Sequence, residues 1–242
     1  MEKINVAGLL VGNVTMSEAV DAVIKFAQDR TQPSVVVTPN AEIAKDALDN
    51  NEFLQTLNKA DMIVPDGAGI VLAAKILGTP LKCKVAGCDL AAALLPELEK
   101  NGLSLFLFGS EPGVAEKAAD NIKAKCPKLN ICGTLNGFFK SDDDVIPTIS
   151  AAKPDVLFVC LGAPKQEHFM FNNRDRLDVG VMLGLGGTVN VMAGTAQRAP
   201  EFFVKMNLEW FYRLLKEPKR FKRMLKLPAY IIEVNKMKNR NK

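Results

Sequence analysis

Four short and continuously apolar segments constrain the fold of this chain more than any other feature. They cover residues 34–38, 103–108, 155–161 and 180–185, and Gly or Pro bounds each of them. Segments of this length predict strands that are buried on both faces, as in a parallel sheet covered by helices. Residues 62–64 and 129–132 are weaker candidates for further strands.

Helical patterns fill the chain between these strand candidates. We expect helices over residues 17–28, 41–57 with a break near Asn50, 69–77, 90–100, 112–125 and 145–152, with Ser17, Asn40 and Ser141 as caps. The alternation predicts an α/β fold for residues 1–195: a Rossmann-like, mostly parallel sheet with helices on both faces. With 48% apolar side chains, the chain can bury one sizeable core.

The C-terminal residues differ from the rest in charge and in pattern. Residues 197–242 hold 13 Lys and Arg against 4 Glu, a net charge of +9, which leaves −5 for residues 1–196 out of the overall +4. Such a tail is attracted to phosphates in lipids or nucleic acid. Apolar residues at helical spacing, with Pro218 and Pro228 each opening a new turn, predict three short helices. We therefore expect residues 196–242 to form a helical appendage.

The composition argues against several classes of protein. No apolar run approaches the roughly 20 residues that span a bilayer. The charges of Glu2 and Lys3 argue against an export signal. Five cysteines without a CxxC pair predict reduced structural thiols, and a single His argues against a dedicated metal site.

Small and polar residues follow the predicted strands, at the edge where an open α/β sheet binds its ligands. Two of these loops are rich in glycine: residues 109–113, beginning at Gly109, and residues 184–188, centred on Gly186. Each loop is either a backbone cradle for a phosphate or a tight turn. The other loops carry Thr38, Asn40, Asp66 and Gln166.

Acidic residues and the lone histidine in these regions have competing interpretations. Asp66 either accepts a proton from a hydroxyl group or caps the helix that follows it. Asp142-Asp143-Asp144 spells a DxD pattern that can hold a metal-bound diphosphate, but a helix start favours acidic residues for its own electrostatics, and we prefer that reading. We expect His168 to lie on a helix surface or to pack there.

Arginines in the tail recur at helical spacing. Spacings of three and four separate Arg213, Lys216, Arg220 and Arg223, so these residues share a face if one helix runs nearly straight through Pro218. Guanidinium groups so arranged can grip a diphosphate while the apolar stripe meets lipid. The alternatives are a solvated basic face and a nucleic-acid surface, although no nucleic-acid module is visible.

Taken in order, these segments resemble the TagA/WecG/CpsF family of glycosyltransferases, glycosyltransferase family 26. The similarity covers nearly the whole chain. The matching segments are Thr38-Pro-Asn40-Ala-Glu42, Ala60-Asp61, Pro65-Asp66-Gly67-Ala-Gly69, Val85-Ala-Gly87-Cys-Asp89-Leu90, Phe108-Gly109-Ser110, Pro154-Asp155, Leu161-Gly-Ala-Pro-Lys-Gln166-Glu167, Arg198-Ala-Pro200, Leu208-Glu-Trp210-Phe-Tyr-Arg213, Glu217-Pro218-Lys-Arg220 and Arg223.

The resemblance implies an inverting, metal-independent enzyme without a cofactor, peripheral on the inner face of the cell membrane. Its most similar members move N-acetylmannosamine from a UDP donor to undecaprenyl-diphosphate-GlcNAc, for the linkage unit of wall teichoic acid. By this resemblance Asp66 is the base that deprotonates the acceptor hydroxyl. The residues implied to bind substrates are Thr38, Asn40, Gln166, Arg213, Arg220 and Arg223, and the glycine loops add Gly109 and Gly186.

Other functions fit the sequence less well. Cys88, His168 and Asn190 depart from the family pattern, so a different UDP-hexose or a uronic acid donor is the first alternative. A Rossmann-type oxidoreductase would carry a GxGxxG turn near its start, and this chain has no such turn. An adaptor for membrane or nucleic acid leaves the loop residues unexplained. The aromatic residues of the tail also suit packing against a second copy of the chain, and we expect no nucleic-acid partner.

Overall fold

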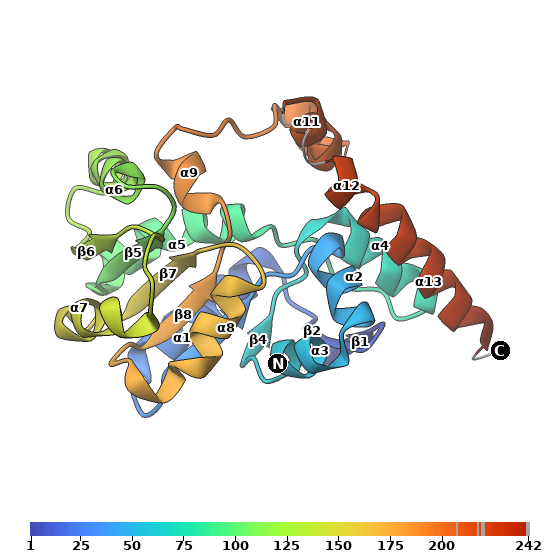
Figure 1. Cartoon of the computed structure of the whole chain (residues 1–242), viewed down its shortest axis with the longest axis horizontal. Coiled ribbons are helices and arrows are strands. Elements are labelled where there is room, and N and C mark those ends of the chain that lie inside the picture. The colour runs from blue at the N-terminus through green and yellow to red at the C-terminus, as the bar shows by residue number, and fades with distance from the viewer. Residues whose placement is uncertain (207, 217, 219–220, 241–242) are drawn as a thin grey trace.

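A parallel sheet forms the centre of the computed structural model, which describes residues 1–206, 208–216, 218 and 221–240 (Figure 1). The six strands lie in the order β4-β3-β8-β7-β5-β6, and every neighbouring pair is parallel. Their bounds are β3 (Ser34–Val37), β4 (Met62–Ile63), β5 (Leu105–Gly109), β6 (Ile131–Leu135), β7 (Val156–Cys160) and β8 (Val181–Gly184). The α/β prediction is confirmed, including both weaker strand candidates.

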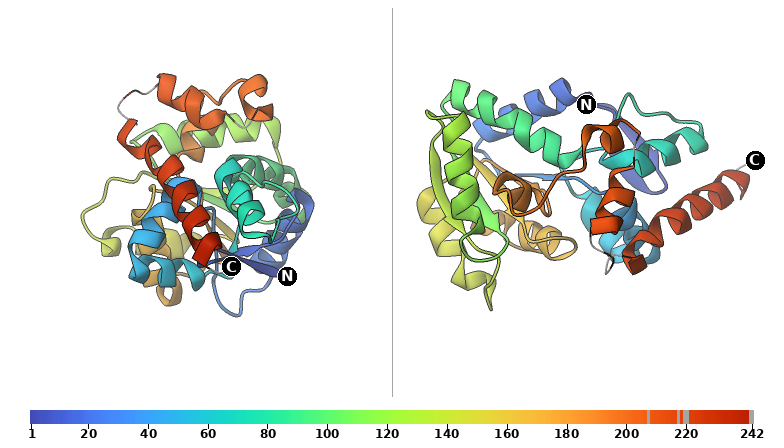
Figure 2. Two further views of the ribbon diagram at one scale, coloured as in Figure 1. Left: turned by 90° about the vertical axis from the view of Figure 1, so that its right-hand side faces the viewer. Right: turned by 90° about the horizontal axis from the view of Figure 1, so that it is seen from above.

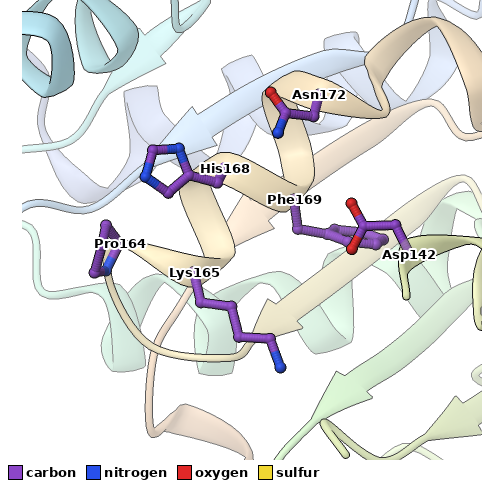
Figure 3. Close-up of a pocket in the computed structure, with 6 residues that line it drawn as sticks. All are labelled: Asp142, Pro164, Lys165, His168, Phe169 and Asn172. Atoms are coloured by element: carbon purple, nitrogen blue, oxygen red, sulfur yellow. The ribbon is translucent and has the colours of Figure 1, made fainter. Parts of the chain in front are cut away.

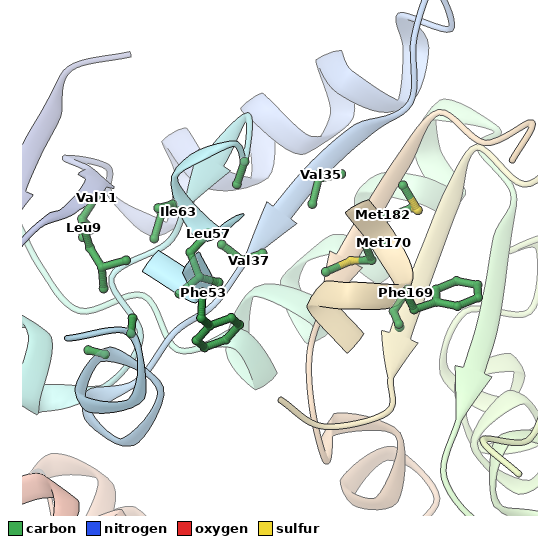
Figure 4. Packing of buried hydrophobic residues seen from close by; sticks show 14 of the residues in the cluster. Leu9, Val11, Val35, Val37, Phe53, Leu57, Ile63, Phe169, Met170 and Met182 are labelled. Carbon is green, nitrogen blue, oxygen red and sulfur yellow. The ribbon is translucent and has the colours of Figure 1, made fainter. Parts of the chain in front are cut away.

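Helices cover both faces of this sheet, because successive side chains of each strand point to opposite sides. Val35 and Val37 join one apolar core, whereas Val36 joins the other. The first core is covered by α2 (Ala41–Asp49), α3 (Asn51–Asn58), α4 (Gly67–Leu77), α7 (Ile146–Ala152) and α8 (Lys165–Asn172). The second core is covered by α1 (Met16–Gln28), α5 (Gly87–Asn101), α6 (Val114–Lys125) and α9 (Thr188–Met192). Figure 4 shows part of the first core around Val35, Phe53 and Met170.

The sequence analysis missed an antiparallel hairpin at the N-terminus. Strands β1 (Lys3–Val6) and β2 (Leu9–Gly12) pair through a two-residue turn at Ala7 and Gly8, whose φ values are 51° and 93°. Hairpin turns of two residues favour positive φ because this matches the twist of the strands. β1 (KINV) mixes polar with apolar residues, and β2 (LLVG) is apolar but only four residues long, so neither gives the longer apolar run that marks most of the central strands.

Side-chain caps fix where several helices begin. Asn40 caps α2 and Asn50 caps α3, which confirms both the cap at Asn40 and the break near Asn50. Ser141 caps the short 3-10 helix at Asp142–Asp144, also as expected. The cap predicted at Ser17 is wrong. Thr15 caps α1 instead, because Glu18 lies three residues later and completes a reciprocal capping box.

The C-terminal region contains more helix than the sequence predicted. Its described residues form α10 (Glu201–Lys205), α11 (Glu209–Lys216), α12 (Phe221–Met224) and α13 (Lys226–Arg240), so the prediction of three short helices is wrong. Helix α13 has 15 residues because Pro228 lies in its first turn, where proline is tolerated. It runs along α2 and α4 in Figures 1 and 2, and its Tyr230 and Val234 are fully buried in the first core.

Two further observations concern the helices and the cysteines of the described residues. No helix in the described ranges combines the length and the apolarity needed to cross a bilayer. All five cysteines are free thiols, as predicted, and burial raises the pKa of the Cys160 thiol to about 12. A thiol with such a pKa stays protonated and is inert near neutral pH, which suits a structural role.

Candidate functional site

Residues that follow β3 and β8 are joined across the carboxyl edge of the sheet. The Thr38 hydroxyl donates a hydrogen bond of 2.8 Å to the carbonyl oxygen of Gly184, and both groups are buried. Gly87, the first residue of α5, packs so closely against Thr38 that an added Cβ would lie 2.9 Å from its Oγ1. Thr38 is therefore held rigidly at the floor of this edge by two neighbouring elements.

Asp66 and Asn40 occupy the starts of two adjacent helices. Asp66 stands at the N-cap position of α4, yet its side chain makes no capping hydrogen bond. Asn40 stands at the same position of α2, and its Oδ1 accepts from the amides of Glu42 and Ile43 at 2.9 and 3.1 Å. A Cβ added to Gly67 would lie 3.8 Å from Cβ of Asn40, so the two helix starts are in contact. The interpretation of Asp66 as a side-chain cap is thus wrong.

Gln166 acts on the second glycine loop from beneath. Its side chain is 2% exposed, and its Oε1 accepts a hydrogen bond of 2.9 Å from the amide of Gly186. Its Nε2 donates to Oε1 of Glu167 at 2.8 Å. Because both ends of the amide are engaged, the orientation of Gln166 and the position of Gly186 are fixed together.

Glu167 is a buried carboxyl group that the sequence analysis did not single out. The residue is 1% exposed, and its Oε2 has no hydrogen-bond partner. Burial raises the pKa of Glu167, while the hydrogen bond from Gln166 lowers it in part. Nothing in the local sequence separates Glu167 from an ordinary exposed acid at a helix start, since only tertiary packing buries it.

The first glycine loop lies beside the second. Gly109 has φ 131°, and a Cβ there would lie 2.3 Å from the carbonyl oxygen of Cys160, so only glycine fits. The next residue, Ser110, donates from Oγ to Oδ1 of Asn190 at 2.8 Å and so ties this loop to α9. β5 and β7 are neighbours in the sheet, but the chain leads from β5 to β6 on one side of this pair and from β7 to β8 on the other side. The carboxyl ends of β5 and β7 therefore form a topological switch point, where open α/β sheets bind ligands.

The side chains of the Asp142-Asp143-Asp144 run make structural contacts within the fold. Asp144 completes the capping box of Ser141, Asp142 accepts from Nδ2 of Asn173 at 2.6 Å, and Asp143 pairs with Arg176. The expected helix-start role is therefore confirmed. Among the described residues, no group of three or more His, Cys, Asp or Glu side chains is arranged to hold a metal ion.

A cavity of about 370 Å³ lies against the outer side of α8, and its lining residues include Asp142, Lys165 and His168 (Figure 3). None of Thr38, Asn40 and Asp66 lines it. His168 is exposed, and its ring packs against Phe53 with 6.1 Å between the ring centroids, as expected for a surface histidine. This cavity is thus separate from the cluster at the sheet edge.

The tail arginines do not lie on one straight helix. Helix α11, which contains Arg213, ends at Lys216, and α12, which contains Arg223, begins only at Phe221. Arg220 and the side chain of Arg213 lie outside the described residues. The Nε of Arg223 donates to Oε2 of Glu42 at 3.1 Å, which places its guanidinium beside the first turn of α2.

The structure therefore brings Thr38, Asn40, Asp66, Gln166 and Gly186 into one connected cluster, with Gly109 along the same edge. A sequence profile described as the glycosyl transferase WecG/TagA/CpsF family matches residues 4–242. A match over nearly the whole chain, on a fold whose loops converge in this way, makes the protein a glycosyltransferase. It belongs to the WecG/TagA/CpsF family.

Curated relatives narrow the class further. The chain is 38% identical over 208 residues to a protein of Bacillus spizizenii, covering 86% of this chain and 81% of that protein. It is 34% identical over 230 residues to a protein of Bacillus subtilis, covering 95% and 90%. It is 32% identical over 241 residues to a protein of Staphylococcus aureus, covering 99% and 95%. All three relatives are named N-acetylglucosaminyldiphosphoundecaprenol N-acetyl-beta-D-mannosaminyltransferase.

Proposed function

We propose that this protein transfers N-acetylmannosamine from UDP-ManNAc to undecaprenyl-diphosphate-GlcNAc, the step that builds the linkage unit of wall teichoic acid. The names of three relatives that align over most of their length support the acceptor and the transferred sugar. The observation that supports the chemical role is the position of Asp66. Its carboxylate group stands at the start of α4, which contacts the start of α2 where Asn40 lies.

In the proposed reaction Asp66 takes the proton from the attacking hydroxyl of the acceptor sugar. The hydroxyl oxygen forms a bond to the anomeric carbon of the donor, on the face opposite the diphosphate, and the bond from that carbon to the diphosphate oxygen breaks. UDP leaves with the electron pair, and the configuration at the anomeric carbon inverts. Thr38, Asn40 and Gln166 shape the pocket for the sugar and the nucleotide.

The leaving diphosphate gains negative charge, and the proposed enzyme stabilises this charge without a metal. Gly109 and Gly186 carry no side chain, so in this proposal the backbone of their loops comes close to the phosphate groups. Arg213, Arg220 and Arg223 supply guanidinium groups that bind a diphosphate through two parallel hydrogen bonds. Preorganised donors of this kind stabilise a developing anion most effectively where water is excluded.

The first prediction tests Asp66. We expect Asp66→Asn to lower kcat/KM by at least about 100-fold, the usual contribution of a general base. Because Asn has nearly the same size and shape as Asp, the thermal unfolding midpoint should stay close to that of the wild type. UDP release is measured with UDP-ManNAc and a short-chain prenyl-diphosphate-GlcNAc, in EDTA.

The matched control is Asp142→Asn in the DxD run, where an amide oxygen can still accept from Asn173. This variant should turn over like the wild type, with or without Mg²⁺. Equal turnover of Asp66→Asn and the wild type would overturn the base assignment. A dependence on Mg²⁺ that Asp142→Asn abolishes would overturn the metal-independent mechanism. A parallel screen of UDP-sugars with one acceptor identifies the donor.

A further inference from the structure

The C-terminal region is attached to the rest of the chain by ion pairs, and three of those among the described residues end on α2. Lys45 of α2 pairs with Glu233 of α13 at 3.2 Å, and the other two pairs use carboxylates of α2. Arg223 pairs with Glu42 at 3.1 Å, and Lys226 pairs with Asp46 at 2.6 Å. Glu42 and Asp46 lie four residues apart, so they face the same side of α2. The helix that Asn40 caps therefore presents two carboxylates in a row to the segment that runs from α12 into the first turn of α13.

Glu42 belongs to the same helical turn as the candidate site residue Asn40. Its backbone amide is one of the two that the Asn40 side chain caps, and its own side chain is only 12% exposed. Its carboxylate is thereby held in place, at the point where β3 leads into α2. Arg223, in contrast, is well exposed at the surface apart from this contact.

A second contact places the same segment beside the first turn of α4, the helix that begins after Asp66. Gly69 lies in the first turn of α4, three residues after Asp66, and an added Cβ there would lie 2.6 Å from Cβ of Ala41 and 3.9 Å from a methyl group of Leu227. Leu227 follows Arg223 closely in the chain. The segment thus touches the first turns of both helices, those that begin after Asn40 and after Asp66.

The geometry of the contact between Glu42 and Arg223 suits a role for Glu42 in orienting the Arg223 guanidinium group. Glu42 engages Nε of Arg223, whereas the two terminal nitrogens form the separate edge of the guanidinium fork. Partly exposed ion pairs contribute little to stability, and the buried residues of α13 already anchor this region. What the pair adds is orientation of a planar, bidentate donor.

We propose that Glu42 is the positioning residue of Arg223: it holds the guanidinium at the rim of the Asn40 and Asp66 cluster so that the guanidinium grips a substrate diphosphate. The inference rests on the proposed function. The diphosphate belongs either to the nucleotide donor or to the lipid-linked acceptor, and the kinetics of the two substrates distinguish these sources.

The test is a double-mutant cycle with Glu42→Gln, Arg223→Ala and the double variant. We expect Arg223→Ala to raise the KM of one substrate by about tenfold and Glu42→Gln by about threefold to fivefold, in line with the loss of a charge-assisted hydrogen bond. In the Arg223→Ala background, Glu42→Gln should have no further effect. Glu42→Asp, which keeps the charge, should restore part of the loss.

Asp46→Asn is the matched control, because it removes the neighbouring ion pair on the same helix and leaves Glu42 intact. It should leave both KM values unchanged, whereas a role in docking alone would make it equal to Glu42→Gln. Additive effects of Glu42→Gln and Arg223→Ala would overturn the proposal, as would a KM that falls in Glu42→Gln, since Glu42 would then compete with the diphosphate.

A binding measurement separates this inference from the proposed function. The wild type, Glu42→Gln, Arg223→Ala and the double variant are titrated with inorganic pyrophosphate by calorimetry, which requires no sugar transfer. Weaker and non-additive pyrophosphate binding in a protein that transfers no ManNAc would reject the proposed function and keep the role of Glu42. Equal pyrophosphate affinity in all four proteins would reject the role of Glu42 even if the transfer is observed.

Discussion

Gln166 and Glu167 show how much of this site depends on single side chains that never reach solvent. The Gln166 amide is fixed between Gly186 and Glu167, so the glycine loop and the buried carboxyl group form one unit. Gln166 was predicted from the family resemblance as a substrate-binding residue. The contacts of its side chain also give it a second task, the placement of the Gly186 amide.

The buried carboxyl group of Glu167 predicts a pH-dependent stability. Burial raises its folded-state pKa above the ordinary value of 4.5, so the folded chain holds this proton more tightly than the unfolded chain. The stability it supports is fully present below the ordinary pKa and is lost as the pH rises through the raised pKa. We expect Glu167→Gln to gain stability relative to the wild type as the pH rises above the ordinary pKa of 4.5, until the raised pKa of Glu167 is passed.

Urea unfolding at several pH values measures this difference. The control is Glu116→Gln on α6, which makes the same chemical change at an exposed side chain and so reports what the loss of a surface carboxyl group does by itself. If the difference in stability between Glu167→Gln and the wild type does not change with pH, or shrinks as the pH rises, burial does not raise the pKa of this carboxyl group.

At the scale of elements, the site is built from the first turns of α2 and α4. Both helices begin directly after a strand of the sheet, and the Gly67 and Gly69 positions let them approach each other without side chains between them. Asn40 therefore combines a cap, which stabilises a helix, with a location suited to substrate. Asn50 has the first property alone, at the start of α3.

Because Asn40 and Asn50 cap their helices in the same way but only Asn40 lies at the candidate site, substitutions of the two residues should affect stability alike and activity differently. Asn40→Ala and Asn50→Ala each remove two capping hydrogen bonds of similar length, so each should lower the free energy of unfolding by about 1 kcal/mol. Only Asn40→Ala should also lower kcat/KM, by about tenfold or more, the loss of one well-placed hydrogen bond. Chemical unfolding and the UDP-release assay measure the two effects. Equal kinetic losses in both variants would remove Asn40 from the substrate site.

At the scale of the whole molecule, the basic tail has two parts with different surroundings. Helix α13 shares the first core with β3 through Tyr230 and Val234, so deleting the tail would open that core. Helices α10 to α12 instead expose a group of large apolar side chains. These are Phe202, Met206, Phe211, Leu215, Phe221 and Leu225.

We propose that these exposed side chains insert into the inner leaflet of the membrane. Replacing Phe202, Leu215 and Phe221 together by Ser should weaken binding to vesicles containing phosphatidylglycerol by at least about tenfold, because burying one large apolar side chain contributes about 1.5–3 kcal/mol. Sedimentation with vesicles measures the binding. Point substitutions are preferred to a deletion because they leave α13 in place.

Phe138→Ser is the matched control, since Phe138 is 71% exposed but lies on the α/β body. It should bind vesicles like the wild type. If the triple variant binds vesicles normally and light scattering instead shows a smaller particle than the wild type, the aromatic residues form an interface between two copies and the membrane proposal fails.

The sequence by itself determined that the chain forms a mostly parallel sheet, and in which succession its strands and helices follow along residues 1–195. Strands such as β3 and β7 are continuous apolar runs between Gly or Pro, a local signal that does not depend on distant residues. The same holds for the Asn40 and Ser141 caps, which act within one turn. The hairpin β1–β2 was missed because each of its strands has only four residues and β1 mixes polar with apolar side chains, which leaves a weak local signal.

Only the tertiary structure decided how residues distant in sequence meet. It buried Glu167 against Gln166, joined Thr38 to Gly184, and packed α13 into the core that the strands share. It also set Glu42 beside Arg223, although 181 positions separate them in the chain. Periodicity and caps arise from neighbours within a few residues, whereas burial and ion pairs across the fold depend on how whole elements pack. For that reason the sequence predicted the loops of the candidate site, and the structure decided which of their side chains act on one another.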